Sequence, residues 1–242
     1  MVATEPSVVL VHGAWADGSS WASVMAPLIA AGQKVAAVSL SLTSFEADVM
    51  AVERALERVV GPIVLVAHAY AGAVIAAARD ERVEALVYIA ALAPEEGETV
   101  ADVFYRAPPH QRAPKLSPDT HGLIYLPEPA FAEAFAPNAT AQQQALLAAV
   151  QRPIAASCIA TRVARPRWRD VPSWYLLAGQ DYMILPETQH FMAQRMRARV
   201  RAHDVDHTPM VTAPKAVLDI VSEAIAEVGR RDRQPPPSVR AT

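Results

Sequence analysis

One carboxylate and one histidine in the second half of the chain, Asp181 and His207, are of the types that perform acid–base chemistry. Asp181 ends the segment 174–181, which has the pattern of a strand followed by a turn, and His207 lies in the loop segment 204–210. An imidazole can take up and release a proton near neutral pH. Each residue also has a purely structural interpretation, because aspartate is common in turns and histidine in surface loops.

A tight turn of small residues connects a buried strand to a helix within the segment 63–74. Ala67 and Ala71 lie two residues before and after Ala69, where small side chains let a strand and the next helix approach closely. This is the layout of a nucleophile elbow with Ala69 at the nucleophile position, and a methyl group can neither attack nor give up a proton. The N–H of Tyr70 would still point at a developing oxyanion. An ordinary strand-to-helix turn is the alternative.

A His-Gly turn follows the first apolar run of the chain, in the segment 8–15. A turn of this kind can aim a backbone N–H, here that of Ala14, at a developing oxyanion. The alternative is a histidine, His12, that only ties the loop down. The motif alone is therefore weak evidence for chemistry.

The His-Gly turn, the elbow, the carboxylate and the histidine follow one another in the order of the α/β-hydrolase machinery. From about residue 7 to residue 228 the chain resembles the α/β-hydrolase superfamily, and segments 12–15, 67–72 and 206–210 resemble a group with small-ester esterases and hydroxynitrile lyases. The resemblance implies an oxyanion hole from the N–H groups of Ala14 and Tyr70, a base at His207 and its orienting acid at Asp181. We also expect substrate contacts from His12, Trp15 and His68. Ala69 departs from the family pattern and rules out a covalent serine mechanism.

No other residue of the sequence restores the nucleophile convincingly. Ser19 and Ser20 fit the N-cap of the first helix, and Cys158 fits a small apolar residue of a helical segment. Tyr70 follows the elbow position, and a phenol with an ordinary pKa near 10 is a proton donor rather than a nucleophile.

Short β-branched runs alternate with helical patterns along the chain, which predicts a mostly parallel sheet wrapped by helices, the α/β class. The predicted strands are 7–11, 34–40, 62–67, 85–91, 173–178 and 200–203, and the predicted helices are 19–31, 44–60, 70–79, 187–197 and 214–228. The proline-rich interval 94–170 has no comparable strand pattern, and we predict a small helical cap inserted between strands. Residues 1–93 and 171–229 then form the core, and 230–242 a disordered tail.

Composition excludes several classes of protein. The 242 residues carry a net charge of −3 and 52% hydrophobic residues, which offers no basic surface to nucleic acid. The longest apolar stretch, 63–78, is too short for a membrane span, and the single cysteine forms no internal disulfide, so we expect a cytoplasmic protein. The remaining histidines show no metal-ligand spacing. We expect no metal and no cofactor, a small-molecule partner, and an oligomeric state compatible with a homodimer.

Three functions stay open. The first is an enzyme that acts on a small hydrophobic ester, lactone or carbonyl compound through His207, Asp181 and a backbone oxyanion hole, as a hydrolase or a lyase without a serine. The second is a serine esterase with an inactivating Ser-to-Ala change at position 69. The third is a non-catalytic protein that binds a small ligand. A cap rich in aromatic and aliphatic residues favours an apolar substrate in each case.

Overall fold

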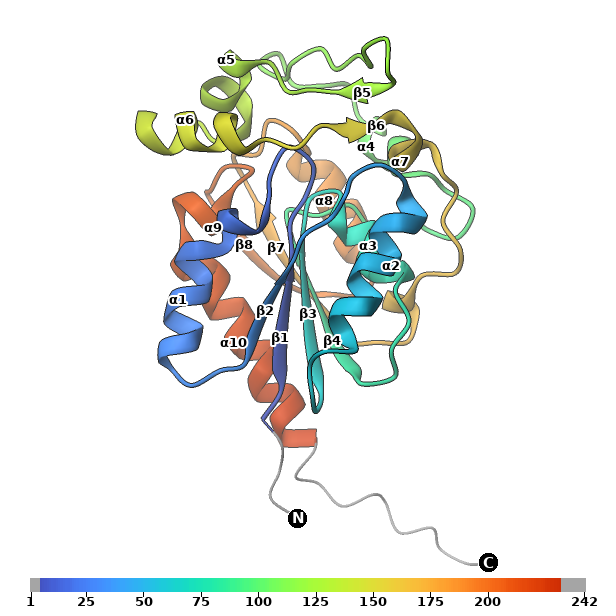
Figure 1. Cartoon of the computed structure of the whole chain (residues 1–242), viewed down its shortest axis with the longest axis vertical. Helices are drawn as coiled ribbons and strands as arrows, with labels where there is room; N and C mark the ends of the chain where they lie inside the picture. The colour runs from blue at the N-terminus through green and yellow to red at the C-terminus, as the bar shows by residue number, and fades with distance from the viewer. Residues whose placement is uncertain (1–4, 232–242) are drawn as a thin grey trace, which may run out of the picture.

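The computed structural model describes residues 5–231, and a parallel sheet of six strands forms its centre (Figure 1). The strands are β1 (Ser7–Val11), β2 (Val35–Val38), β3 (Ile63–His68), β4 (Val83–Ile89), β7 (Ser173–Ala178) and β8 (Arg199–His203), in the spatial order β2-β1-β3-β4-β7-β8. Every residue of β1 and β3 is buried, as expected for strands covered on both faces. The predicted α/β fold and its six parallel strands are confirmed, with strand ends that differ by up to two residues.

Helices cover both faces of the sheet (Figure 1). One face carries α1 (Ala22–Ala30), α9 (Pro209–Thr212) and α10 (Pro214–Arg231), and the other carries α2 (Phe45–Leu56), α3 (Ala71–Ala77) and α8 (Pro186–Arg195). Alternate residues of a strand point to opposite faces, so Val8 and Leu10 join the cluster under α1 and α10 while Val9 and Val11 join the other. The predicted helix 19–31 is a 3-10 turn (Gly18–Trp21) followed by α1.

Most of the chain between β4 and β7, from residue 94 to residue 160, lies over the carboxyl ends of the strands (Figure 1), and residues 161–170 return to the amino end of β4, where Arg167 donates to the carbonyls of Asp80 and Val83. The segment 94–170, called the cap below, contains α4 (Val100–Phe104), β5 (Leu123–Ile124), α5 (Glu128–Ala130), a π-helical turn (Phe131–Phe135), α6 (Ala141–Val150), β6 (Ile154–Ala155), α7 (Ala156–Ala160) and a 3-10 turn (Arg167–Arg169). The cap is mostly helical, as predicted, and it also contains the short antiparallel pair β5 and β6. Two residues per strand leave no periodicity that a sequence pattern could reveal.

Hydrogen bonds tie the cap to loops of the core. The backbone N–H of Trp15 donates to the carbonyl of Arg152 at 3.0 Å, and its indole Nε1–H donates to the carbonyl of Ile124 at 2.9 Å. The N–H of Ala155 donates to the carbonyl of Leu42 at 2.8 Å. These bonds fix the position of the cap above the first strand.

The final helix, α10, continues to Arg231, beyond the predicted end at residue 228. Glu227 pairs with Arg230 and Arg231 at 2.6 and 3.2 Å, which stabilises the last turn. The predicted tail therefore does not begin at residue 230, and from residue 232 on it lies outside the described residues.

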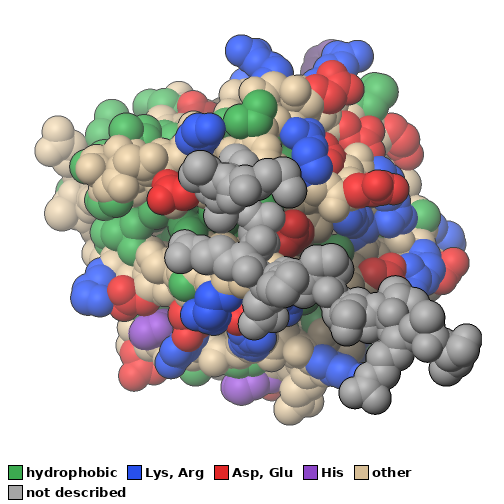
Figure 2. All heavy atoms as spheres, turned by 90° about the horizontal axis from the view of Figure 1, so that it is seen from below, with side chains coloured by type: hydrophobic (Ala, Val, Ile, Leu, Met, Phe, Trp, Pro, Cys, Tyr) green, Lys and Arg blue, Asp and Glu red, His purple; other side chains and the backbone are tan. Residues whose placement is uncertain are grey.

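The surface at the amino ends of the strands carries basic and acidic side chains side by side (Figure 2). Within residues 5–231, no helix combines the length and the apolar character that crossing a membrane requires.

Gly72 marks the closest approach of α3 to the chain after β4. A Cβ atom at this position would lie 2.4 Å from the carbonyl oxygen of Leu92 and 2.9 Å from the Cβ of Ala91. We predict that Gly72→Ala lowers the free energy of unfolding, measured with urea, by about 1–3 kcal/mol. Gly229→Ala is the matched control, because this position in α10 has open space around it and should gain up to about 1 kcal/mol. Equal stabilities of the two variants would contradict the close packing of α3.

Candidate active site

Ala69 forms the turn that joins β3 to α3, and its backbone has a φ of 49°. This left-handed conformation costs a residue with a Cβ about 1–2 kcal/mol, so neighbouring contacts must hold it. The carbonyl of Ala69 accepts hydrogen bonds from the N–H groups of Gly72 at 3.1 Å and Leu92 at 2.9 Å. The turn thus has the backbone of an elbow, and its side chain lies on the wall of a pocket.

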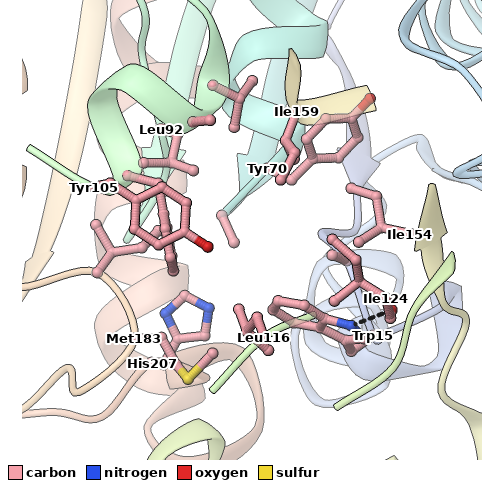
Figure 3. Close-up of a pocket in the computed structure, with 16 residues that line it drawn as sticks. Trp15, Tyr70, Leu92, Tyr105, Leu116, Ile124, Ile154, Ile159, Met183 and His207 are labelled. Atoms are coloured by element: carbon pink, nitrogen blue, oxygen red, sulfur yellow. Dashed lines mark hydrogen bonds between the residues drawn. The ribbon is translucent and has the colours of Figure 1, made fainter. Parts of the chain in front are cut away.

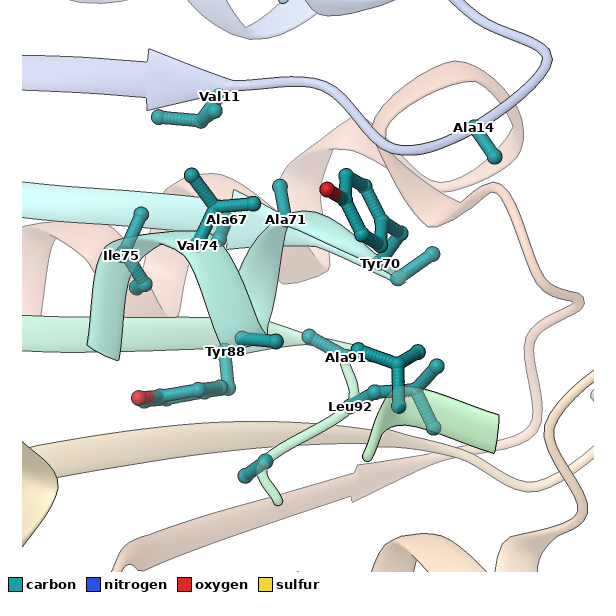
Figure 4. Packing of buried hydrophobic residues seen from close by; sticks show 14 of the residues in the cluster. Val11, Ala14, Ala67, Tyr70, Ala71, Val74, Ile75, Tyr88, Ala91 and Leu92 are labelled. Carbon is teal, nitrogen blue, oxygen red and sulfur yellow. The ribbon is translucent and has the colours of Figure 1, made fainter. Parts of the chain in front are cut away.

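Small residues allow the elbow to form. Figure 4 shows Ala67 on β3 close to Ala71 and Val74 on α3, with Ala91 and Leu92 on the far side of the helix. Ala67 and Ala71 are fully buried. Larger side chains at positions 67 and 71 would separate the helix from the strand and open the turn.

Two backbone N–H groups face the same pocket from different loops. Gly13 packs so tightly against the elbow that a Cβ there would lie 2.9 Å from the Cβ of Ala69. This approach places Ala14, like Tyr70, on the pocket wall. Neither the N–H of Ala14 nor that of Tyr70 donates a hydrogen bond to any acceptor within residues 5–231. Two backbone donors without a partner beside one pocket are among the groups that an oxyanion hole requires, and the role itself remains the prediction made from the sequence.

His207 and Asp181 meet in the structure, as their order along the chain predicts. The Nδ1–H of His207 donates to Oδ2 of Asp181 at 2.8 Å, and both side chains are at most 2% exposed. This bond fixes the tautomer, so the Nε2 lone pair of His207 is free. No group within residues 5–231 binds Nε2, and the ring lines the pocket.

The carboxylate of Asp181 is fully hydrogen bonded. Its Oδ1 accepts from the N–H groups of Met183 at 2.7 Å and Ile184 at 2.9 Å. Its Oδ2 accepts from Nε2 of Gln189 at 2.9 Å as well as from His207. A buried carboxylate needs such donors because it has lost its water. The arrangement fixes the carboxylate against Nδ1 of His207 and so orients the imidazole.

The pocket between the elbow and the cap is narrow and apolar, with a volume of about 50 Å³. Its walls are Ala14, Trp15, Ala69, Tyr70, Leu92, Val100, Ala101, Phe104, Tyr105, Leu116, Ile124, Ile154, Ile159, Met183, Ile184 and His207. Figure 3 shows His207 on one side and Trp15 across from it. Cap and core residues together therefore enclose the free nitrogen of His207.

A family model described as the alpha/beta hydrolase family matches residues 8–220. The chain belongs to the α/β-hydrolase family. The matched range contains the elbow, Asp181 and His207. No curated protein sequence matches this α/β-hydrolase significantly.

Solved structures show the same fold. Polyneuridine aldehyde esterase is 18% identical with a TM-score of 0.79, over 91% of this chain and 99% of the other. A mutant of tomato methylketone synthase I is 16% identical with a TM-score of 0.80, over 93% and 99%. An extracellular α/β-hydrolase from a Paenibacillus species is 20% identical with a TM-score of 0.74, over 90% and 98%. At these identities the likeness concerns the fold alone.

His12 and His68, expected to contact substrate, do not line the pocket of this α/β-hydrolase. His12 donates from Nδ1 to the carbonyl of Gly13 at 2.8 Å and accepts at Nε2 from the N–H of Leu40 at 3.0 Å. His68 donates from Nε2 to the carbonyl of His207 at 2.7 Å. Both fix loops below the pocket. Trp15, the third residue of that expectation, does line it.

The other nucleophile candidates are engaged elsewhere. The hydroxyl of Tyr70 donates to Oδ2 of Asp48 at 3.0 Å, and burial together with Asp48 raises the pKa of this phenol. Burial raises the pKa of the Cys158 thiol to about 11, so little thiolate forms near neutral pH. Ser19 and Ser20 lie inside the 3-10 turn and donate to Asp17, which is the N-cap, so the N-cap role predicted for the two serines was wrong.

Three residues of the site carried no recognisable signal in the sequence. Asp48 is fully buried although it lies on the amphipathic helix α2, where a polar residue predicts a solvent-facing position. Gln189 is an ordinary polar residue of α8. Asp206 is buried too, and its Oδ2 accepts from the N–H of Asn138 in the cap at 2.9 Å. Within residues 5–231, no cluster of three potential metal ligands forms.

The two buried histidines, His12 and His68, predict acid sensitivity. Burial lowers the pKa of His12 and lowers that of His68 further, whereas an unfolded histidine has a pKa near 6.5. Below about pH 6.5 the unfolded chain therefore binds protons that the folded chain does not, and the free energy of unfolding falls as pH falls. The slope approaches about 1.4 kcal/mol per pH unit for each histidine.

Urea unfolding between pH 5 and 7.5 measures this slope. We predict that His68→Gln, which keeps a donor toward the carbonyl of His207, lowers the slope by about 1.4 kcal/mol per pH unit. His190→Gln, on the exposed side of α8, is the matched control. An unchanged slope in His68→Gln would mean that the buried imidazole binds its proton in the folded state.

Proposed function

We propose that this α/β-hydrolase acts on a small hydrophobic ester, lactone or carbonyl compound without a covalent serine intermediate. The supporting observation is the His207–Asp181 pair, which is complete and faces the pocket beside an alanine at the elbow. A base without a nucleophilic side chain can still activate water or remove a proton from a carbon next to a carbonyl group.

In hydrolysis, Nε2 of His207 takes a proton from water while the water oxygen bonds to the substrate carbonyl carbon. The electrons of the carbonyl π bond move to the oxygen, which accepts hydrogen bonds from the N–H groups of Ala14 and Tyr70. The electrons on the oxyanion then re-form the carbonyl double bond as the bond between carbon and the alkoxide breaks, and the imidazolium, oriented by Asp181, gives its proton to the departing alkoxide. In a lyase or isomerase reaction, the same base takes a carbon-bound proton and the same N–H groups hold the enolate.

The names of proteins with similar structures support a reaction at a carbonyl or ester group. Their names include esterases, pyrethroid hydrolases and a methylketone synthase. The fold in those proteins thus supports both hydrolases and a synthase. We propose a small-molecule substrate for this chain on the same grounds, because the pocket is apolar with few polar groups.

A serine esterase with an inactivating change at position 69 is the second candidate. The φ of 49° at Ala69 favours it, because a strained elbow has no evident use for a residue that cannot attack. A serine codon at position 69 of the native gene would establish this candidate.

The serine-free mechanism predicts turnover that depends on His207. Purified protein is assayed with small aryl esters, lactones and aryl ketones, with product detected by chromatography. His207→Ala should lower kcat about 10²- to 10⁴-fold, the usual contribution of general acid–base catalysis. His190→Ala, an exposed histidine, should retain full activity. Turnover that survives His207→Ala would contradict the mechanism, and a ligand that stabilises the protein but is recovered unchanged would indicate a binding protein.

The elbow geometry predicts a gain of function for Ala69→Ser. The new hydroxyl should lie within about 2.6–3.2 Å of Nε2 of His207 and attack activated aryl esters, with a burst of the phenol product in the first turnover. His207→Ala in the same protein should abolish the burst. Ala101→Ser, which places a serine elsewhere on the pocket wall, should give none. A folded Ala69→Ser protein without a burst and without labelling by a serine-directed phosphonate would contradict the elbow.

A further inference from the structure

Four side chains with nitrogen or oxygen atoms line the active-site pocket: Trp15, Tyr70, Tyr105 and His207. The indole N–H of Trp15 donates to the carbonyl of Ile124, and the hydroxyl of Tyr70 donates to Asp48. His207 keeps Nε2 free for the reaction. The hydroxyl of Tyr105 has no hydrogen bond to any residue from 5 to 231, and Figure 3 shows it pointing toward the centre of the pocket.

Tyr105 is held by its own short helix. It directly follows α4, where its N–H donates to the carbonyl of Ala101 at 2.9 Å. Thr99 and Asp102 form a reciprocal capping box at the start of α4, with bonds of 2.8 and 3.0 Å. The ring packs edge-on against Phe104 with centroids 4.9 Å apart. The capping box and the backbone hydrogen bond fix the position of the Tyr105 backbone, and Phe104 packs against its ring.

Tyr105 also stands at a boundary between two cavities. A second cavity of about 480 Å³ opens outside the pocket and shares Phe104, Tyr105, Leu116 and Met183 with it. The inner pocket, at about 50 Å³, is too small for a whole drug-sized substrate, whose sites span about 300–1,000 Å³. A substrate whose carbonyl group reaches His207 and that is too large for the inner pocket can extend past Tyr105 into this second, outer cavity.

We propose that Tyr105 selects substrates that carry a second oxygen one or two atoms away from the reacting carbonyl carbon. The carbonyl head occupies the inner pocket, and the remaining chain passes Tyr105, whose hydroxyl donates a hydrogen bond to that second oxygen. An ether, ester or hydroxyl oxygen fits, because a phenol is a donor to each of them. This inference rests on the function proposed above and adds the substrate class.

The two oxygens must be different atoms of the substrate. In the proposed reaction, the carbonyl oxygen of the substrate accepts hydrogen bonds from the N–H groups of Ala14 and Tyr70. Ala14 lies in the loop after β1, and Tyr70 lies at the elbow. Tyr105 comes from the cap, and Figure 3 places it across the pocket from Trp15. Tyr105 is 51% exposed, so with a monofunctional carbonyl compound its hydroxyl would stay hydrogen bonded to water and would add nothing to binding.

Methyl ketones test the inference, because hydrolysis cannot consume them. The first isosteric pair is 1-(benzyloxy)propan-2-one and 5-phenylpentan-2-one, and the second is 4-(benzyloxy)butan-2-one and 6-phenylhexan-2-one. In each pair an ether oxygen replaces a methylene group. Dissociation constants are measured by calorimetry for the unaltered protein, Tyr105→Phe and Tyr125→Phe. Tyr125 is the matched control, because it is also 51% exposed but does not line either cavity.

We expect the preference for the ether over the methylene ketone, in at least one pair, to fall about three- to tenfold in Tyr105→Phe and to stay unchanged in Tyr125→Phe. Ligand desolvation cancels, because the same two ligands are compared in all three proteins. If the ketones bind and the preference for the ether over the methylene ketone is the same in all three proteins, the proposed role of Tyr105 is wrong, while the proposed function of the pocket stands. Failure of every ketone to bind the unaltered protein would overturn the proposed function of the pocket. Thermal unfolding checks that Tyr105→Phe is folded.

Discussion

The carboxylate of Asp181 is buried at the end of β7, and four hydrogen-bond donors surround it because no water can. Satisfying this one group sets much of the site. Two of its donors are the backbone N–H groups of Met183 and Ile184, so the loop that forms one pocket wall must curl around it. A third comes from Gln189, which also accepts from Ala178 and locks α8 to the sheet. The fourth is the imidazole that would act as base.

The elbow is a separate steric constraint on the same end of the sheet. Gly13 and Gly72 are places where any side chain would collide with neighbouring atoms, so β1, β3 and α3 can come together only with these residues. The resulting packing holds Ala69 in an unfavourable backbone conformation and keeps two N–H groups without partners among residues 5–231. The hydrogen bonds of Asp181 fix His207, and the close packing of β1, β3 and α3 fixes Ala69. The space between Ala69 and His207 is the pocket.

The sheet and its helices could be predicted because they are encoded in local patterns, buried strands of β-branched residues and amphipathic helices. The elbow and the pairing of Asp181 with His207 could be predicted because their order along the chain is informative. The pairing of β5 with β6 and the burial of Asp48 could not, since each depends on contacts between segments far apart in sequence. His12 and His68 were assigned to substrate, yet a histidine that binds backbone looks the same in a sequence as one that faces a ligand.

The hydrogen bonds between the cap and the core affect how molecules enter and leave the pocket. Arg152, Ile124 and Ala155 are bound to core loops, and Asn138 is bound to Asp206 directly before the histidine. Swinging the cap away as one body would break these bonds and disturb His207. For the enzyme proposed above, substrate and product would then pass the cap where it stands, and one path that the structure offers is the cavity beside Tyr105. Departure of a bulky product along such a path, rather than the bond-breaking step, would limit the turnover rate.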